Sequence, residues 1–252
     1  MIKKQIPNLF TLLNLLSGVI AVIMAATDNL IEAAFFVFLG IFFDFFDGFF
    51  ARKFNVTGEF GKQLDSLADM VTSGVAPGII MFQLILFAAK ERYFMDLSCE
   101  IGNWGSFDES KFYLLPLIGL LIPLSSAYRL AKFNLDERQT SSFIGLPTPA
   151  LAIFILSLPL IIEYSGYQIL INILQNTYVL IFITLIGSFL LNAEIPLFSL
   201  KFKNYQLADN KVRYTFLFIS ILLFSIFKIV GIPLVIILYV FISVADNMRA
   251  KK

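Results

Sequence analysis

The chain has 252 residues, of which 58% are hydrophobic and 15% are charged, and its formal net charge is +1. This composition is far more apolar than that of an ordinary soluble domain. The sequence contains no histidine and a single cysteine, Cys99. A histidine base, a phosphohistidine intermediate and an intrachain disulfide are therefore excluded.

Runs of about 18 or more mostly apolar residues recur along the chain, which is the pattern of transmembrane helices. Eight spans are expected, at residues 9–27, 31–51, 66–89, 112–132, 148–164, 173–192, 213–230 and 232–248, the last two joined by a tight turn. The first is expected to be a retained helix, because no small-residue cleavage site precedes a polar domain. The sequence predicts an all-α, polytopic membrane protein with a single membrane-embedded domain over residues 1–252.

The distribution of basic residues predicts the orientation in the membrane. With the N-terminus inside, fifteen of the 19 lysines and arginines fall in segments on the cytoplasmic side. Basic residues favour the cytoplasmic side, and an even number of spans returns the chain to the side from which it starts. Both termini are therefore expected in the cytoplasm, and the protein is expected in the inner membrane of the cell. The basic residues lie at membrane edges and form no continuous stripe, so no nucleic-acid binding is expected.

Two pairs of aspartates flank the turn between the second and third spans: Asp44 and Asp47 precede it, and Asp65 and Asp69 follow it. An ionised carboxylate near a bilayer centre costs roughly 2.5–3.5 kcal/mol. Four of them are tolerated only if they bind a cation or line a wet cavity. At about 100° per residue, each pair lies on one helix face, and the short turn should set the two faces against each other on the cytoplasmic side.

Small residues accompany the aspartates, with Gly48 and Ala51 on the first face and Gly61 on the second. Their lack of bulk lets a backbone or a flat ligand approach closely. Carboxylate oxygens that converge from two helices form the kind of site that binds Mg²⁺ or Mn²⁺. Three interpretations fit this spacing: metal-dependent phosphate chemistry, a divalent-cation transporter, and structural pairing of the carboxylates with Arg52 or Lys62.

The residues from Asp44 to Asp69 follow the pattern D-x-x-D-G-x-x-A-R-x8-G-x-x-x-D-x-x-x-D. This pattern resembles the signature of the CDP-alcohol phosphatidyltransferases at every fixed position. The resemblance implies an integral membrane enzyme that transfers a phosphatidyl group from a CDP-linked lipid to an alcohol and releases CMP. It also implies a divalent metal cofactor, Mg²⁺ or Mn²⁺, and a homodimer.

The same resemblance implies roles for the residues of the motif. The expected metal ligands are Asp44, Asp47, Asp65 and Asp69, with Asp69 also the base that takes the proton of the acceptor hydroxyl. The residues expected to contact the nucleotide are Asp44, Gly48, Ala51, Arg52 and Gly61.

Four further segments resemble the membrane-embedded bacterial and archaeal phosphatidylserine synthases within this family: Ile6 to Gly18, Leu64 to Gly78, Tyr128 to Asn134 and Phe143 to Ala150. This resemblance implies CDP-diacylglycerol as the donor and L-serine as the acceptor. Glycerol 3-phosphate, inositol phosphate and choline stay open as other acceptors. The resemblance covers a catalytic core over residues 8–160, and residues 161–252 are expected to add further transmembrane helices.

Two groups of polar residues have less specific expectations. Arg129 and Lys132 end the fourth span on the cytoplasmic side, where they would bind the carboxylate of serine or the lipid phosphate, or simply flank the membrane. Asn8, Thr11 and Asn14 share a face of the first helix. They would line the entrance to the site or form hydrogen bonds between helices.

Overall fold

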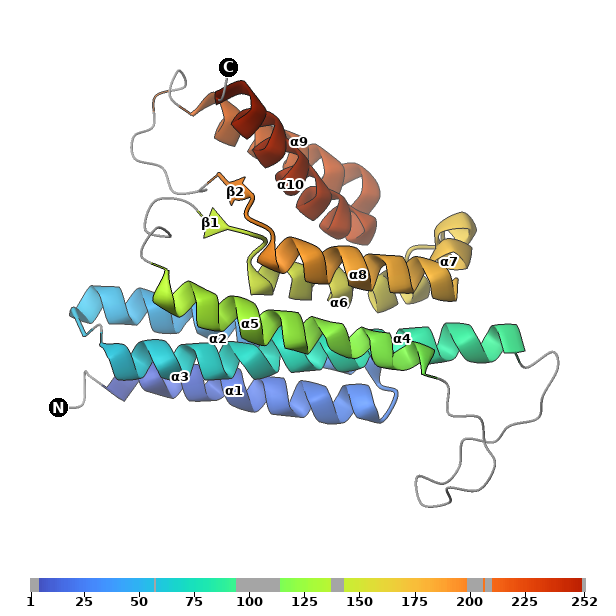
Figure 1. The fold of residues 1–252 in the computed structure, drawn as a ribbon, viewed down its shortest axis with the longest axis horizontal. Helices are drawn as coiled ribbons and strands as arrows, with labels where there is room; N and C mark the ends of the chain where they lie inside the picture. Colours follow the sequence, from blue (N-terminus) through green and yellow to red (C-terminus); the bar gives the residue numbers. More distant parts are fainter. Residues whose placement is uncertain are drawn as a thin grey trace.

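The structure, a computed structural model, describes residues 5–56, 58–93, 114–136, 143–198, 206 and 210–250. These residues are helical almost throughout (Figure 1). The helices are α1 (Gln5–Ala26), α2 (Leu30–Phe54), α3 (Glu59–Asp69), α4 (Ala76–Tyr93), α5 (Leu121–Leu135), α6 (Thr148–Tyr164), α7 (Gln168–Leu174), α8 (Thr177–Asn192), α9 (Lys211–Phe227) and α10 (Gly231–Ala250). Cys99 falls within residues 94–113, which lie outside the described residues.

Every predicted apolar stretch overlaps one of these helices or a pair of them. By length and composition, however, four helical stretches among the described residues are suited to cross a membrane: Gln5–Ala26, Leu30–Phe54, Glu59–Ala89 and Lys211–Met248. α7 and α8, bent by 71° relative to each other, add a fifth if the pair is one span. The prediction of eight spans is therefore not confirmed. One reason is α6, whose 17 residues fall short of the roughly 20 that a span needs.

The stretch Lys211–Met248 folds back on itself. Lys228 adopts a left-handed backbone conformation with φ 49°, within the short 3-10 turn η5 (Lys228–Val230). The rings of Phe216 and Tyr239, which come from opposite sides of this turn, lie 5.8 Å apart. α9 and α10 therefore form an antiparallel hairpin, which lies obliquely across the end of the helix stack in Figure 1.

α1 and α2 form a second antiparallel hairpin, closed by Asp28 in a left-handed conformation with φ 65°. The buried sides of the two helices carry small residues, which let neighbouring backbones approach closely: Ser17, Gly18, Ala21, Ala25, Ala33, Ala34 and Gly40. Other sides of both helices expose large apolar residues, among them Leu9, Leu12, Leu16, Phe42, Phe45 and Phe49. An apolar outer surface of this kind is typical of a multi-pass membrane protein.

The chain reverses again between α2 and α3. Asn55 follows α2 in the left-handed conformation, with φ 52°, and the next amide, that of Val56, bonds to the carbonyl of Ala51 at 3.0 Å. This is a common way for a helix to end, and it sends α3 away from the end of α2. α3 continues through a π-helical turn, η2 (Met70–Val75), into α4. π-turns inside helices occur frequently at functional sites.

The second half of the described chain packs against this N-terminal part. α5 follows a 3-10 helix, η3 (Leu115–Leu120), and contacts η2 and α8, while α6 contacts α2 and α4. Two short strands, β1 (Phe143–Ile144) and β2 (Pro196–Leu197), pair antiparallel and join the segment before α6 to the segment after α8. Fully buried Ile80, Ile85 and Ile155 belong to the apolar core between these helices.

Candidate active site

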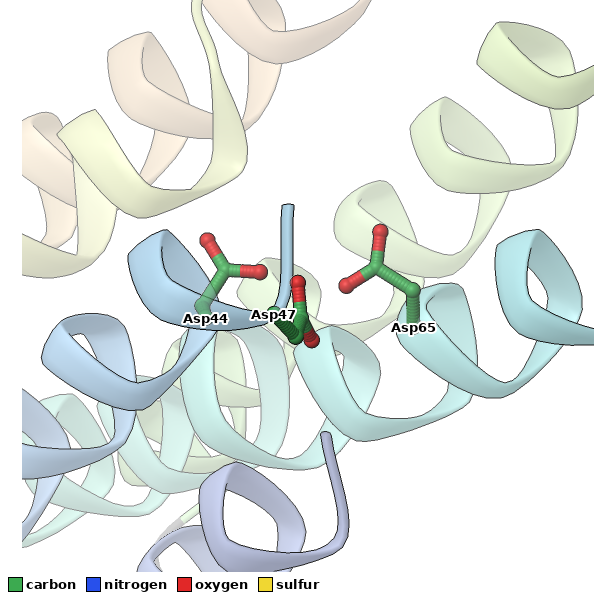
Figure 2. Close-up of side chains that lie close together, drawn as sticks. All are labelled: Asp44, Asp47 and Asp65. Carbon is green, nitrogen blue, oxygen red and sulfur yellow. The ribbon is translucent and has the colours of Figure 1, made fainter. Parts of the chain in front are cut away.

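Three carboxylates converge from two helices. Asp44 and Asp47 lie in the C-terminal half of α2, and Asp65 lies in the middle of α3. One oxygen of each lies within 4.8 Å of an oxygen of the other two. Figure 2 shows the three side chains side by side, with Asp47 between the other two. The structure thus brings together three of the four aspartates that the sequence singles out.

The position of the cluster follows from the two faces of α2. Asp44 and Asp47 lie on the side of α2 that meets Asp65, and Asp47 is only 7% exposed. Phe45 and Phe49, between and beyond them in sequence, are exposed on another side of the helix. The turn at Asn55 then brings α3 back so that Asp65 meets the polar face of α2.

Asp69 lies beside this cluster rather than within it. It is the last residue of α3, one turn beyond Asp65, and it is not among the three residues whose oxygens lie within 4.8 Å of one another. Its Oδ1 accepts a hydrogen bond from Nδ2 of Asn14 at 3.2 Å. Asp69 is therefore held against α1, at the point where α3 passes into the π-turn.

The negative charge of the cluster is not neutralised by nearby side chains. Among the described residues, no lysine or arginine nitrogen lies within 4.0 Å of a carboxylate of the cluster, and the ion pair that the structure shows joins Lys132 to Glu194. Oδ1 of Asp65 is buried and has no hydrogen-bond partner. A buried carboxylate oxygen without a partner is costly, and a bound cation would remove that cost. A donor set made only of carboxylate oxygens suits a hard divalent cation, so the residues present fit such an ion.

The small residues of the motif leave space beside the carboxylates. The atoms nearest to a Cβ atom added at Gly48 belong to the guanidinium of Arg52, at 3.8 Å. Among the described residues, a Cβ atom added at Gly61 would come within 4 Å only of Oδ1 of Asn8, at 3.8 Å. Ala51 is half-buried and Arg52 is exposed. This face therefore has room for a ligand, with the guanidinium of Arg52 at its edge.

Arg129 and Lys132 lie on α5 and differ in their surroundings. Arg129 is 6% exposed, its Nε donates to the carbonyl of Leu146 at 2.6 Å, and its charge interacts with that of Asp69. Lys132 is half-buried, and its ammonium pairs with Glu194 at 3.1 Å. Both side chains line a small hollow together with Ile144, Leu191, Asn192 and Ala193. Arg129 is therefore the basic residue on α5 that the structure links to the aspartates.

The sequence did not predict the hydrogen-bond partners of the polar residues of α1. Thr11 Oγ1 donates to Oδ2 of Asp47 at 2.7 Å, and Asn14 donates to Asp69, whereas Asn8 donates to Gln5 at 3.4 Å within its own helix. Their helical spacing predicts that the three residues share a face of α1, but it does not predict which carboxylates accept their hydrogen bonds.

Contacts at the start of α3 were also missed. Lys62 donates to the backbone carbonyl of Asn134 at 2.9 Å, and the Asn134 amide donates to Ser66 at 2.8 Å. The alternative in which Lys62 pairs with the aspartates therefore has no support in this geometry.

Comparison with known proteins decides the family. The family model for the CDP-alcohol phosphatidyltransferases matches residues 4–244. The chain belongs to this family. The metal-fitting cluster and the open glycine face lie on the segment that carries the signature of the CDP-alcohol phosphatidyltransferases.

Three curated relatives of this family are similar to the chain over much of its length. A CDP-diacylglycerol–serine O-phosphatidyltransferase of Bacillus subtilis is 34% identical over 150 residues, which cover 58% of this chain and 70% of the relative. An archaetidylserine synthase of Methanothermobacter thermautotrophicus is 31% identical over 163 residues, covering 64% and 60%. A CDP-diacylglycerol–serine O-phosphatidyltransferase of Helicobacter pylori is 28% identical over 221 residues, covering 86% and 78%.

Proposed function

We propose that this protein transfers the phosphatidyl group of CDP-diacylglycerol to the hydroxyl of L-serine, giving phosphatidylserine and CMP. The observation that carries the proposal is the convergence of three carboxylates from two helices on the family's signature. The relatives named for serine transfer favour serine over glycerol 3-phosphate, inositol phosphate or choline as the acceptor.

The reaction forms one bond and breaks one bond at the same phosphorus. The serine oxygen bonds to the phosphorus that carries diacylglycerol, the bond from this phosphorus to the bridging oxygen breaks, and that oxygen leaves with CMP. The serine hydroxyl must lose its proton, and Asp69 is the carboxylate assigned to accept it. We assign a single displacement without a covalent enzyme intermediate.

Asp44, Asp47 and Asp65, with Asp69 at the edge of the group, would hold the metal ion, Mg²⁺ or Mn²⁺. When bound, this ion would neutralise the pyrophosphate and the leaving CMP. The face formed by Gly48, Ala51 and Gly61 would receive the nucleotide. Asp44 borders this face, and the exposed Arg52 guanidinium beside Gly48 would contact the phosphates.

The acceptor side is assigned to α5. Arg129 is buried and interacts with the charge of Asp69, so a serine whose carboxylate bonds to Arg129 would place its hydroxyl toward the base. Lys132 belongs to the same side, although its pairing with Glu194 makes it the weaker candidate. Hydroxyls of Ser73 and Ser126 are buried nearby without hydrogen-bond partners and are available to a polar ligand.

The membrane arrangement proposed for the chain follows the charge distribution. In the eight-span arrangement expected from the sequence, fifteen of the 19 basic residues lie on one side, which favours a cytoplasmic active site, cytoplasmic termini and an inner-membrane location. Residues 8–160 would form the catalytic core, and residues 161–252 would add helices around it. The family resemblance favours a homodimer.

The proposal is tested by transfer from CDP-diacylglycerol to a panel of acceptors. Purified protein in detergent is given the donor, Mn²⁺ or Mg²⁺, and in parallel labelled serine, glycerol 3-phosphate, inositol phosphate or choline. We expect metal-dependent label in the extracted lipid with serine alone. Transfer to another alcohol would keep the family and overturn serine, while metal flux into liposomes without any CMP release would favour a transporter.

A further inference from the structure

The first helix donates two hydrogen bonds to the aspartates of the site. Thr11 Oγ1 reaches Oδ2 of Asp47 at 2.7 Å, and Asn14 Nδ2 reaches Oδ1 of Asp69 at 3.2 Å. The two donors are three residues apart and share a face of α1, but they reach carboxylates on two different helices. α1 therefore donates one hydrogen bond to Asp47, within the carboxylate cluster, and another to Asp69, beside the cluster.

Asn14 is fixed from several sides. It is 0% exposed, and its backbone carbonyl accepts a hydrogen bond from Thr72 Oγ1 at 3.1 Å. A Cβ atom added at Gly40 would lie 2.9 Å from Asn14 Oδ1, and one added at Gly18 would lie 2.3 Å from Thr72 Oγ1. The amide therefore occupies a space that Gly40 on α2 leaves for it, and Thr72 of the π-turn behind Asp69 lies against Gly18 on α1 in the same junction.

Such a fixed donor determines which oxygen of Asp69 is available. Oδ1 is engaged by Asn14, so the carboxylate cannot turn about its Cβ–Cγ bond without losing this hydrogen bond. A general base works only when its accepting oxygen lies within hydrogen-bond reach of the proton that it takes. Holding Oδ1 therefore presents Oδ2 of Asp69 in one direction.

Thr11 orients a different carboxylate, that of Asp47, in the same way. Its hydroxyl lies 3.1 Å from the carbonyl of Pro7 and 2.7 Å from Asp47, so its single proton is shared, and the shorter contact is to the carboxylate. Asp47 is 7% exposed and belongs to the group of three oxygens that fits a metal ion. A hydrogen bond to a ligating carboxylate orients it, and loss of such a bond typically costs 10–100-fold in metal affinity or activity.

We propose that Asn14 and Thr11 are positioning residues with separate duties: Asn14 orients the base Asp69, and Thr11 orients the metal ligand Asp47. This assignment rests on the proposed function of the site. It predicts that the two residues, one helical turn apart, affect different measurable quantities. Loss of the Asn14 donor should lower kcat, and loss of the Thr11 donor should weaken metal binding.

The experiment compares Asn14→Leu and Thr11→Val, which remove a donor with little change in volume. The matched control is Ser17→Ala, because Ser17 lies on the same face one turn further along and its hydroxyl bonds to the carbonyl of Leu13 at 2.8 Å, within its own helix. Each protein is assayed for kcat and KM with the alcohol that best supports CMP release. Binding of Mn²⁺ alone is followed by the loss of the free-ion electron paramagnetic resonance signal, and the unfolding temperature is measured in the same detergent.

For Asn14→Leu we expect kcat to fall about 10–100-fold, while Mn²⁺ binding weakens much less than in Thr11→Val, because Asp69 lies only at the edge of the metal group. For Thr11→Val we expect the Mn²⁺ dissociation constant to rise by a similar factor, with activity recovered at high Mn²⁺. Ser17→Ala should match wild type in every measurement.

An unchanged kcat in Asn14→Leu would overturn the role of Asn14. A fall in kcat accompanied by equally weakened Mn²⁺ binding and a lower unfolding temperature would also overturn it, because that pattern indicates a structural role. If the leucine variant does not fold, Asn14→Ala removes the amide donor without adding bulk or charge and must show the same loss of kcat. Unchanged Mn²⁺ binding in Thr11→Val would overturn the role of Thr11. Because the best acceptor is used whatever its identity, failure of serine transfer contradicts the proposed function without deciding these two roles.

Discussion

Replacing Gly18 with alanine tests the contact between the first helix and the π-turn that follows Asp69. An added Cβ atom would lie 2.3 Å from Thr72 Oγ1 and 2.9 Å from Thr72 Cα. The hydroxyl is engaged by the carbonyl of Asn14, and the Cα atom belongs to the backbone of η2. Neither atom can give way unless α1 or η2 moves.

The expected cost is the difference of two terms. Overpacking of a well-packed interior costs typically 1–3 kcal/mol, and a contact with a backbone atom belongs at the upper end. Alanine offsets about 1 kcal/mol of this through its better helix propensity. The net loss of about 2 kcal/mol corresponds to a fall of roughly 4–8 °C in unfolding temperature for a chain of this size.

The matched control is Gly58→Ala. Gly58 has an extended backbone with φ −164°, and no atom of the described residues lies within 4 Å of a Cβ atom added there. Gly58 is the N-cap of α3, where alanine is less favourable than glycine, so this change should cost up to about 1 kcal/mol, less than the cost expected for Gly18→Ala. Both variants are compared with wild type by thermal unfolding in one detergent, and by phosphatidyl transfer at a temperature where all are folded. Gly18→Ala should also transfer more slowly, because a shift of α1 alters the bond from Asn14 to Asp69. An unchanged unfolding temperature together with full activity would refute the packing argument.

Three other predictions follow from the assigned site. Gly61→Leu fills the open face beside the carboxylates without loss of helix propensity. The KM for CDP-diacylglycerol should therefore rise while the unfolding temperature stays the same, and an unchanged KM would place the nucleotide elsewhere. Arg129→Gln should raise the KM for serine about 10–150-fold, as expected for a charge-assisted hydrogen bond worth about 1.5–3 kcal/mol, whereas Lys132→Gln should raise it less than about fivefold; equal effects would contradict the ranking. Chelation with EDTA should abolish transfer reversibly, and Mn²⁺ should restore it in wild type but not in Asp65→Asn.

Local patterns in the sequence predicted much of this arrangement. Asp44 and Asp47 are three residues apart on one helix, and Asp65 follows a short turn, so helical periodicity is enough to place their carboxylates together. Apolar runs were likewise enough to predict where the helices lie. They were not enough to count the membrane spans, because the length of α6 and the bend between α7 and α8 depend on how these helices pack.

The partners of the polar side chains were beyond local reasoning. Asn14 and Asp69 are 55 residues apart in sequence, and Lys62 and Asn134 are 72 apart. Periodicity places a side chain on a helix face, but which residue it meets depends on the crossing of the helices. The π-turn after Asp69 has no reliable sequence signal either, and its packing, with Thr72 against Gly18 and Gly40, joins segments far apart in the chain.

The most direct test of the account is the stoichiometry of one reaction. Purified wild-type protein, CDP-diacylglycerol, Mn²⁺ and labelled serine are incubated, and CMP release and labelled phosphatidylserine are counted in the same sample. The account predicts one CMP for each labelled lipid, dependence on the metal, and loss of both products in Asp69→Asn. Labelled lipid formed at the wild-type rate by Asp69→Asn, or CMP released without labelled lipid in the wild type, would contradict it.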